Sequence, residues 1–91
     1  MNLQEIIKNT NTILVDVRTP SEFMDGSAAG AVNIPLDVIQ GETDSFNGKE
    51  NIVVFCRSGN RSAQAKQILE RLGFKNVINA GTWEDVLSLQ Q

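Results

Sequence analysis

The most informative segment of the chain is an apolar run followed by a polar loop, and it reads Ile52-Val53-Val54-Phe55-Cys56-Arg57-Ser58-Gly59-Asn60-Arg61-Ser62. Its first four residues are apolar and mostly β-branched, which predicts a short strand buried on both faces. From residue 65 onward, apolar side chains recur at i, i+3, i+4 and i+7, which predicts a helix that ends at Gly73. Cys56 therefore comes at the carboxyl end of a strand and just before a helix, where ligands bind in open α/β sheets.

Strand-like and helix-like segments also alternate in the rest of the chain. Apolar, β-branched runs predict three further strands, at residues 13–17, 31–34 and 77–79. Capping residues predict helices that begin just after Asn2, Thr19 and Thr82. A turn of helix is expected at residues 36–39. This alternation predicts a single α/β domain over residues 1–91, with helices on both faces of a small, mostly parallel sheet of about four strands.

The composition excludes several classes of site. The chain has 91 residues, one cysteine and no histidine. One thiol makes no internal disulfide, and without imidazoles it makes no Cys- or His-based zinc site. The lack of histidine also excludes nucleophiles that an imidazole activates, as in Ser-His-Asp and Cys-His sites. Any nucleophile in this chain must therefore be activated in another way.

Net charge and hydropathy indicate which partners to expect. The net charge is −3, whereas general nucleic-acid binding needs a basic face, so we expect no nucleic-acid partner. No apolar run approaches the roughly 20 residues of a membrane span, so we expect no membrane partner. The first residues lack the pattern of a secretory signal. A lone reactive thiol suits the reducing cytoplasm, which is the expected compartment; the alternative is the periplasm, if a leader has been removed.

The charges are unevenly distributed along the chain. Residues 1–50 carry three basic and eight acidic residues, whereas residues 51–76 carry five basic residues and one acidic residue. The basic segment contains the only cysteine, and we interpret it as a basic patch around that cysteine. Arg57 and Arg61 within it are suited to guiding an anionic substrate. Charge alone favours a plainer interpretation, a solvated helix face.

The loop after Cys56 has the features of an anion-binding cradle. Unpaired N–H groups and the helix dipole make the N-terminus of the following helix electropositive. Gly59 and Asn60 tolerate positive φ, so the chain can curl with its amides toward the sulfur, and Ser62 is expected to cap the helix. Such surroundings favour a thiolate over a thiol. The plainer alternative is that Cys56 is a small buried hydrophobe at the end of a strand.

Three segments of the chain form a family signature: Leu14-Val15-Asp16-Val17-Arg18 with Glu22-Phe23, Gly26, Gly30-Ala31 and Asn33-Ile34-Pro35; Val53 to Ala63; and Gly73-Phe74 with Asn79-Ala80-Gly81 and Trp83. In these segments, which span nearly the whole chain, the protein resembles the single-domain rhodaneses, the thiosulfate sulfurtransferase-like family. The resemblance implies a three-layer rhodanese-like domain.

The resemblance also implies a two-step sulfur transfer that needs neither a metal nor an organic cofactor. Cys56 is the implied nucleophile, which takes sulfur from thiosulfate or a persulfide donor and passes it to cyanide, a cellular thiol or a protein cysteine. The implied donor-binding residues are those of the loop, namely Arg57, Ser58, Gly59, Asn60, Arg61 and Ser62. Arg57 and Arg61 would orient the donor's sulfonate, unless Arg61 points outward or pairs with a carboxylate. A persulfide-carrying or protein-interaction module with little small-molecule turnover is the alternative.

Loop length separates this family from relatives that act on phosphate or arsenate. Those relatives have an arginine six positions after the cysteine, where this chain has Ser62, so phosphatase activity is not expected. The chain departs from the family pattern at Ser27, where relatives often have histidine, and at Ala80, where a second glycine is usual. It also begins at a helix where many relatives have a strand, so we expect four strands and not five.

Other polar residues are expected to hold the structure together. Asp16 and Arg18 are interpreted as a structural pair near a strand end, with Arg18 bridging to Glu22. Asn33 and Asn79 lie near strand ends and are expected to tie down loops rather than touch substrate.

Overall fold

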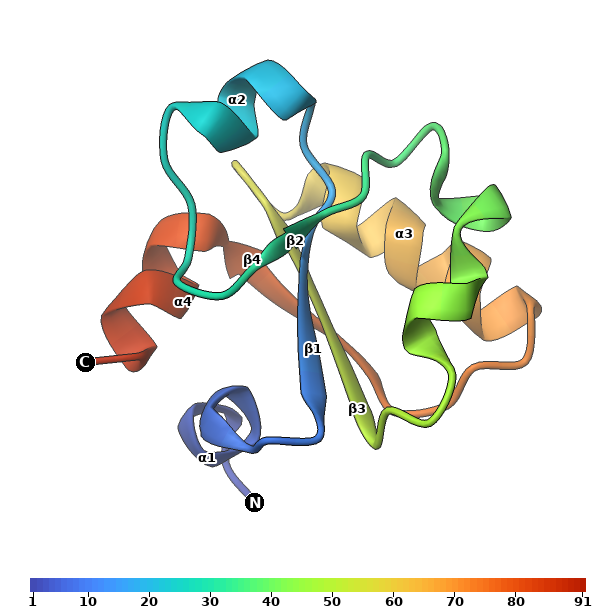
Figure 1. Ribbon diagram of the computed structural model, residues 1–91, viewed down its shortest axis with the longest axis horizontal. Coiled ribbons are helices and arrows are strands. Elements are labelled where there is room, and N and C mark those ends of the chain that lie inside the picture. The colour runs from blue at the N-terminus through green and yellow to red at the C-terminus, as the bar shows by residue number, and fades with distance from the viewer.

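The sheet has four strands, all parallel, in the spatial order β2-β1-β3-β4. In the computed structural model, which describes residues 1–91, the strands are β1 (Thr12–Asp16), β2 (Val32–Asn33), β3 (Asn51–Cys56) and β4 (Val77–Thr82). The α-helices are α1 (Leu3–Lys8), α2 (Pro20–Met24), α3 (Asn60–Arg71) and α4 (Trp83–Leu89). Two short 3-10 helices, η1 (Ile39–Gly41) and η2 (Thr43–Phe46), lie between β2 and β3. The four predicted strands are confirmed, and Figure 1 shows them one behind another, from β2 in front to β4 at the back.

The two central strands, β1 and β3, are apolar on both faces and almost fully buried. Ile13 pairs with Ile52 and Val15 with Val54, and none of these four residues is more than 8% exposed. Such strands are stable only when both faces of the sheet are covered. The pairing of β3 with β4 shifts register after Val54, so that Cys56 lies opposite Thr82. Irregularities of this kind are common beside functional sites, and here one falls at the cysteine.

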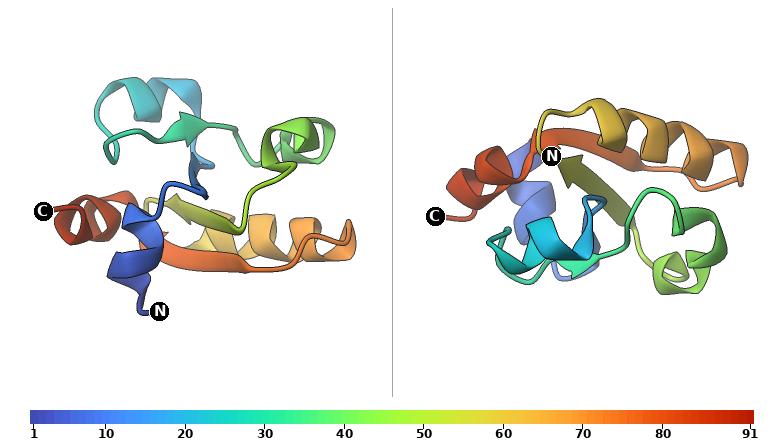
Figure 2. Two further views of the ribbon diagram at one scale, coloured as in Figure 1. Left: turned by 60° about the horizontal axis from the view of Figure 1, so that its bottom comes forward. Right: turned by 90° about the horizontal axis from the view of Figure 1, so that it is seen from above.

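Two buried clusters of apolar side chains fill the two sides of the sheet. On one side, strand residues pack against α3 and the 3-10 helices through Ile39, Phe46, Ala65 and Leu69. On the other side, strand residues pack against α1 and α4 through Ile7 and Val86. Figures 1 and 2 show α1 and α4 on one side of the strands and α3 with η1 and η2 on the other. The predicted three-layer architecture is therefore confirmed.

The helices begin at the predicted capping residues. The Asn2 side chain accepts the Glu5 N–H, the Thr82 hydroxyl accepts the Asp85 N–H, and Thr19 forms a reciprocal capping box with Glu22. At the turn of helix predicted for residues 36–39, residues 36–38 form a turn in which the Val38 N–H donates to the Pro35 carbonyl, and the first 3-10 helix begins at residue 39. No helix combines the length and the apolar character that crossing a membrane requires.

Candidate active site

Cys56 is the last residue of β3, and its side chain lies on the α3 side of the sheet within the buried core. The loop of Arg57, Ser58 and Gly59 follows, and Cys56 has no exposed surface. The twelve-residue helix α3 begins at Asn60, so its N-terminus lies directly beside the sulfur. The unpaired N–H groups and the dipole at that end of a helix stabilise negative charge. The fold therefore places the only thiol where a thiolate is favoured.

Two groups of the following segment contact the Cys56 sulfur. The Gly59 backbone N–H donates to Sγ at 3.0 Å, and Ser62 Oγ lies 3.4 Å from Sγ. Gly59 has a φ of +96°, in the left-handed region that residues with a side chain rarely adopt. This conformation turns the chain so that the Gly59 N–H points inward. The loop therefore curls around the sulfur as predicted.

The surroundings of Cys56 lower the pKa of its thiol. Burial on its own acts in the opposite direction and raises the pKa, because a charge is less stable away from water. The Ser62 hydroxyl and the backbone N–H groups of Ser62, Ser58 and Gly59 outweigh burial, since each of them stabilises the thiolate. The pKa of Cys56 therefore lies below the ordinary value of 9.0.

Ser62 is not the helix cap that the sequence predicted. Gly59 occupies the N-cap position, whereas Ser62 lies in the first turn of α3 and is fully buried. The Ser62 hydroxyl donates to Asn79 Oδ1 at 2.7 Å, and Asn79 Nδ2 donates to the Gly59 carbonyl at 3.2 Å. The prediction is wrong because Ser62 finds its partners on β3 and β4, which spacing along the chain does not reveal. Asn79 ties down the loop as expected.

Asn60 also differs from its prediction. It is the first residue of α3 and has no positive φ, so Gly59 alone supplies the left-handed residue of the loop. One such residue is enough to turn the chain from β3 into α3. The side chains of Arg57, Ser58 and Asn60 are exposed around the buried sulfur. Their roles in binding a donor stay predictions.

Arg61 pairs with Glu22 of α2 through two hydrogen bonds. Its two terminal nitrogens donate to the two carboxylate oxygens of Glu22 at 2.7 and 2.9 Å. The Arg61 side chain, together with the Thr19 N–H, lowers the pKa of Glu22 to about 2. Of the two orientations left open by the sequence, the structure shows pairing with a carboxylate. Arg61 thereby fastens the start of α3 to α2, and its charge is already engaged.

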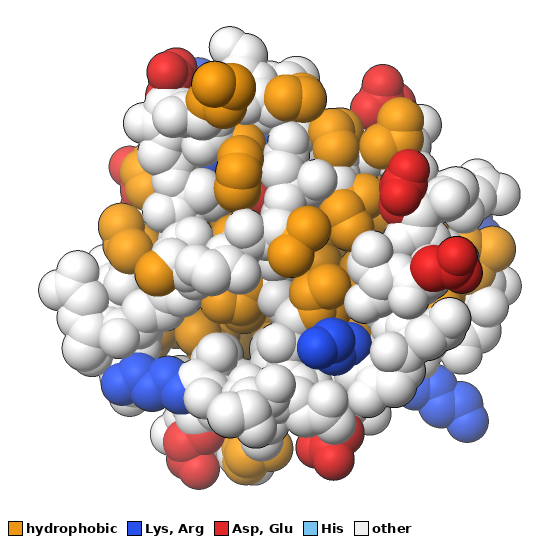
Figure 3. Space-filling model, viewed as in Figure 1, with side chains coloured by type: hydrophobic (Ala, Val, Ile, Leu, Met, Phe, Trp, Pro, Cys, Tyr) orange, Lys and Arg blue, Asp and Glu red, His pale blue; other side chains and the backbone are white.

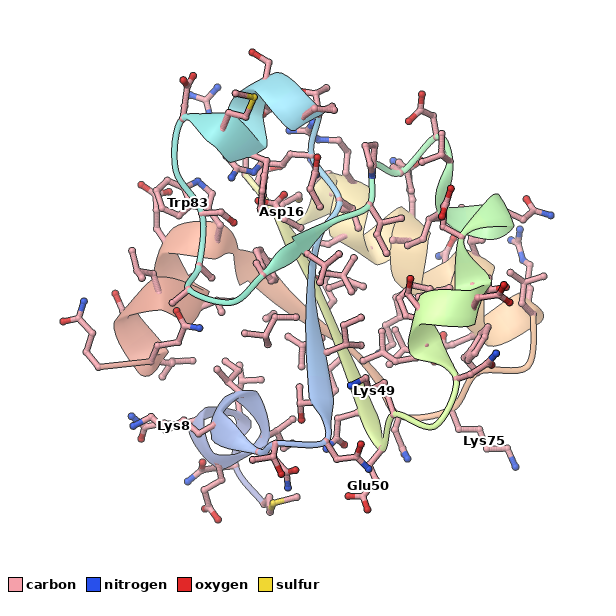
Figure 4. All side chains as sticks on the ribbon, in the orientation of Figure 1. Lys8, Asp16, Lys49, Glu50, Lys75 and Trp83 are labelled. Atoms are coloured by element: carbon pink, nitrogen blue, oxygen red, sulfur yellow. The ribbon has the colours of Figure 1, made fainter.

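Asp16 and Arg18 form the expected buried pair, with exposed fractions of 0% and 5%. The Arg18 guanidinium donates to the Asp16 carboxylate at 2.7 Å and to the Gly26 carbonyl at 2.7 Å, so the predicted bridge from Arg18 to Glu22 is wrong. The Ser27 hydroxyl also donates to Asp16 at 2.7 Å. Ser27, at the position where relatives often have histidine, therefore completes this pair. Figure 4 shows Asp16 near the upper, carboxyl end of the strands.

The basic residues of segment 51–76 do not form one patch. The ion pairs of the structure involve Arg18 and Arg61, so Arg57 is an exposed cation beside the loop without a carboxylate partner. Lys75 lies at the opposite, amino-terminal end of the strands, where it lines a hollow of about 440 Å³ together with Lys49. On the face drawn in Figure 3, most Lys and Arg surface lies at this lower end. The predicted basic patch around Cys56 is therefore wrong, because Arg61 is paired with Glu22 and Lys75 lies at the other end of the sheet.

The fold and the cysteine loop define a class of protein, and comparison with known families identifies it: residues 2–87 match the model of the Rhodanese-like domain, so the chain belongs to that family. It is similar to thiosulfate sulfurtransferase PspE of Escherichia coli, with 35% identity over 74 residues that cover 79% of this chain and 71% of PspE. The family recognised from the sequence is thus confirmed, and so is its thiosulfate sulfurtransferase-like class at the level of the family.

Solved structures agree with this assignment. A rhodanese with anions from E. coli superposes with a TM-score of 0.74 at 34% identity, covering 81% of this chain and 89% of that one. The human single-domain sulfurtransferase TSTD1 gives a TM-score of 0.79 at 28% identity, covering 98% of this chain and 92% of that one. The chain spans 61 to 71% of the length of three curated relatives that it matches.

Two side chains hold the loop through partners that were not predicted. Asn79 was expected to tie down a loop but not to bind Ser62. Glu22 was expected to pair with Arg18 and not with Arg61. The contact of Asn79 with Ser62 had one signal in the sequence, because an amide within an otherwise apolar strand needs a hydrogen-bonding partner. The pairing of Glu22 with Arg61 had no such signal in the sequence. Glu22 belongs to the capping box of α2, and that role already explains a carboxylate at position 22.

Proposed function

We propose that this protein moves sulfane sulfur from an anionic donor, thiosulfate or a persulfide, to a thiophilic acceptor through a persulfide on Cys56. The observation that carries the proposal is the bond from the Gly59 N–H to the Cys56 sulfur at the start of α3. The relatives named thiosulfate sulfurtransferases support the choice of chemistry. A thiol in these surroundings ionises readily and reacts as a thiolate.

In the first step, the Cys56 thiolate attacks the outer sulfur of thiosulfate. A bond forms between Sγ and that sulfur while the S–S bond of thiosulfate breaks, and the electron pair of the broken bond leaves with sulfite. Cys56 then carries a persulfide with one negative charge. A persulfide donor reacts in the same way and leaves as a thiolate. None of these changes calls for a metal or an organic cofactor.

In the second step, a nucleophilic acceptor attacks the outer sulfur of the persulfide. The bond between the two sulfurs breaks, and its electron pair returns to Sγ, so that the Cys56 thiolate is regenerated. Cyanide leaves as thiocyanate, and a thiolate leaves as a new persulfide. In the cell the proposed acceptor is a small thiol or a protein cysteine, and the proposed compartment is the cytoplasm, because a free thiol is maintained there.

The backbone and one arginine are proposed to stabilise the charges of both steps. The N–H groups at the start of α3 and in the loop act on the thiolate and on the persulfide. Arg57 is exposed and unpaired, which suits it to orient the sulfonate of a donor. Arg61 is engaged with Glu22, so we assign it to holding the loop and not to the donor. Because Cys56 has no exposed surface, the loop must yield to admit the donor, which favours small donors.

Thiocyanate production tests the proposal. The protein is mixed with excess thiosulfate and cyanide, and thiocyanate is measured over time for the wild type and for Cys56→Ser. The wild type should form many equivalents per chain, and the variant none above the rate without protein. Equal rates for the two proteins would contradict the proposal.

The pairing of Arg61 with Glu22 favours one second candidate, a persulfide-carrying or protein-interaction module that turns over small donors poorly, because it leaves Arg57 as the one arginine of the loop free to hold an anionic donor. Such a module should form at most one equivalent of thiocyanate per chain in the same assay. The two candidates are therefore separated by turnover, and both need Cys56.

A further inference from the structure

The orientation of the Asn79 side-chain amide is fixed by two backbone groups. The Gly81 N–H donates to Asn79 Oδ1 at 3.0 Å, and Asn79 Nδ2 donates to the Gly59 carbonyl at 3.2 Å. A backbone N–H only donates and a carbonyl only accepts, so exchanging the oxygen and nitrogen of the amide would break both bonds. The Asn79 oxygen therefore faces Ser62, whose Oγ lies 2.7 Å away.

The Ser62 hydroxyl has one hydrogen and two neighbours that can accept it. Oδ1 of Asn79 lies 2.7 Å from Ser62 Oγ, and Sγ of Cys56 lies 3.4 Å from it. Because Oδ1 has no hydrogen, the hydroxyl donates to it and presents only lone pairs to the sulfur. A thiol S–H can donate to those lone pairs, whereas a thiolate needs a donor. With its hydrogen on Asn79, the Ser62 hydroxyl suits the protonated cysteine, and it stabilises the thiolate only once that hydrogen has turned toward the sulfur.

Ionisation of Cys56 changes the direction of the Ser62 hydroxyl. The thiol proton leaves to a base in solution, and the hydroxyl then turns its own hydrogen from Oδ1 to Sγ. Ser62 keeps its proton throughout, and Asn79 Oδ1 keeps its bond from the Gly81 N–H. Formation of the thiolate therefore breaks the hydrogen bond between Ser62 and Asn79.

We propose that Asn79 is a positioning residue, which competes with the Cys56 sulfur for the single Ser62 hydroxyl hydrogen and so sets how readily Cys56 ionises. Its importance for sulfur transfer rests on the proposed function. The competition for the Ser62 hydrogen does not rest on the proposed function, since it concerns Cys56 before any sulfur is bound. A test that follows the ionisation of Cys56 without any sulfur donor therefore keeps the two proposals apart.

The test is the pH dependence of Cys56 alkylation by iodoacetamide in the wild type, Asn79→Ala, Ser62→Ala and the double variant. Removal of Asn79 frees the hydroxyl for the thiolate, so the midpoint of the pH profile should fall by about one unit, since one neutral hydrogen bond is worth roughly tenfold in the equilibrium. Ser62→Ala removes the donor and should raise the midpoint. The double variant should match Ser62→Ala, because no hydroxyl is left to compete for.

Asn33→Ala is the matched control. Asn33 also anchors backbone at a strand end, through bonds to the Asp16 and Arg18 carbonyls, and it has no contact with Ser62. Its midpoint should equal that of the wild type. Asn79→Val, whose β-branched side chain suits a strand, repeats the measurement if the alanine variant does not fold. The proposal would be overturned if the midpoint of the alkylation profile were unchanged or raised in Asn79→Ala. It would also be overturned if loss of Asn79 lowered the midpoint equally in the wild type and in Ser62→Ala.

Discussion

Glu22→Gln removes the charge that holds Arg61 while keeping the size of the side chain. Glu22 accepts two N–H groups from Arg61 at 2.7 and 2.9 Å, and it accepts the N–H and the hydroxyl of Thr19 at 3.1 Å each. Glutamine keeps one oxygen for the Thr19 cap but cannot accept from both guanidinium nitrogens. The variant therefore isolates the link between α2 and α3.

We expect Glu22→Gln to lose about 1 kcal/mol of the free energy of unfolding at pH 7. The Arg61 and Glu22 side chains are 33% and 29% exposed, so water screens the pair and keeps its contribution at about 1 kcal/mol or less. The pKa of Glu22 is about 2 in the fold, against an ordinary value of 4.5. A carboxyl with a lowered pKa stabilises the fold above its ordinary pKa, and this stabilisation is lost as the pH falls toward 2.

Urea denaturation at several pH values measures this effect. The difference in unfolding free energy between wild type and Glu22→Gln should be about 1 kcal/mol at pH 7 and should shrink between pH 4.5 and pH 2. Glu50→Gln changes an exposed carboxylate without an ion pair and should stay within about 0.5 kcal/mol of the wild type. A difference of zero at pH 7, or one that is the same at pH 2 and pH 7, would refute the role given to Arg61.

Two further substitutions test other parts of the site. Asp16→Asn leaves Arg18 buried without a negative partner and should cost about 3 kcal/mol in urea denaturation, so a loss below about 1 kcal/mol would argue against the buried pair. Gly59→Ala puts a side chain at a φ of +96° and should lose about 1 kcal/mol and slow the alkylation of Cys56, whereas Gly41→Ala, with open space around it, should leave alkylation unchanged. Equal alkylation rates in both glycine variants would contradict the account of the loop.

The elements of the fold could be predicted because their causes are local. The apolar run before Cys56 is buried on both faces in β3. The residues Thr19 and Glu22, three positions apart, form the capping box of α2. Interactions between residues this close in sequence do not depend on how the elements pack, so spacing alone indicates them.

The partners of the site side chains could not be predicted in the same way. Arg61 meets Glu22 across 39 positions of sequence, and Ser62 meets Asn79 across 17. Both contacts exist only because α2 and β4 lie beside the start of α3, which depends on strand order and on helix packing. The loop alone indicated that Ser62 caps the helix and left open whether Arg61 faces the donor or a carboxylate, and only the tertiary structure supplies their partners, Asn79 and Glu22.

Intact-mass spectrometry after treatment with thiosulfate shows whether Cys56 carries the transferred sulfur. The wild type should gain the mass of one sulfur atom per chain, and this gain should disappear on addition of cyanide or a thiol. Cys56→Ala should gain none. An unmodified wild type, or an equal gain in Cys56→Ala, would contradict the claim that Cys56 carries the transferred sulfur.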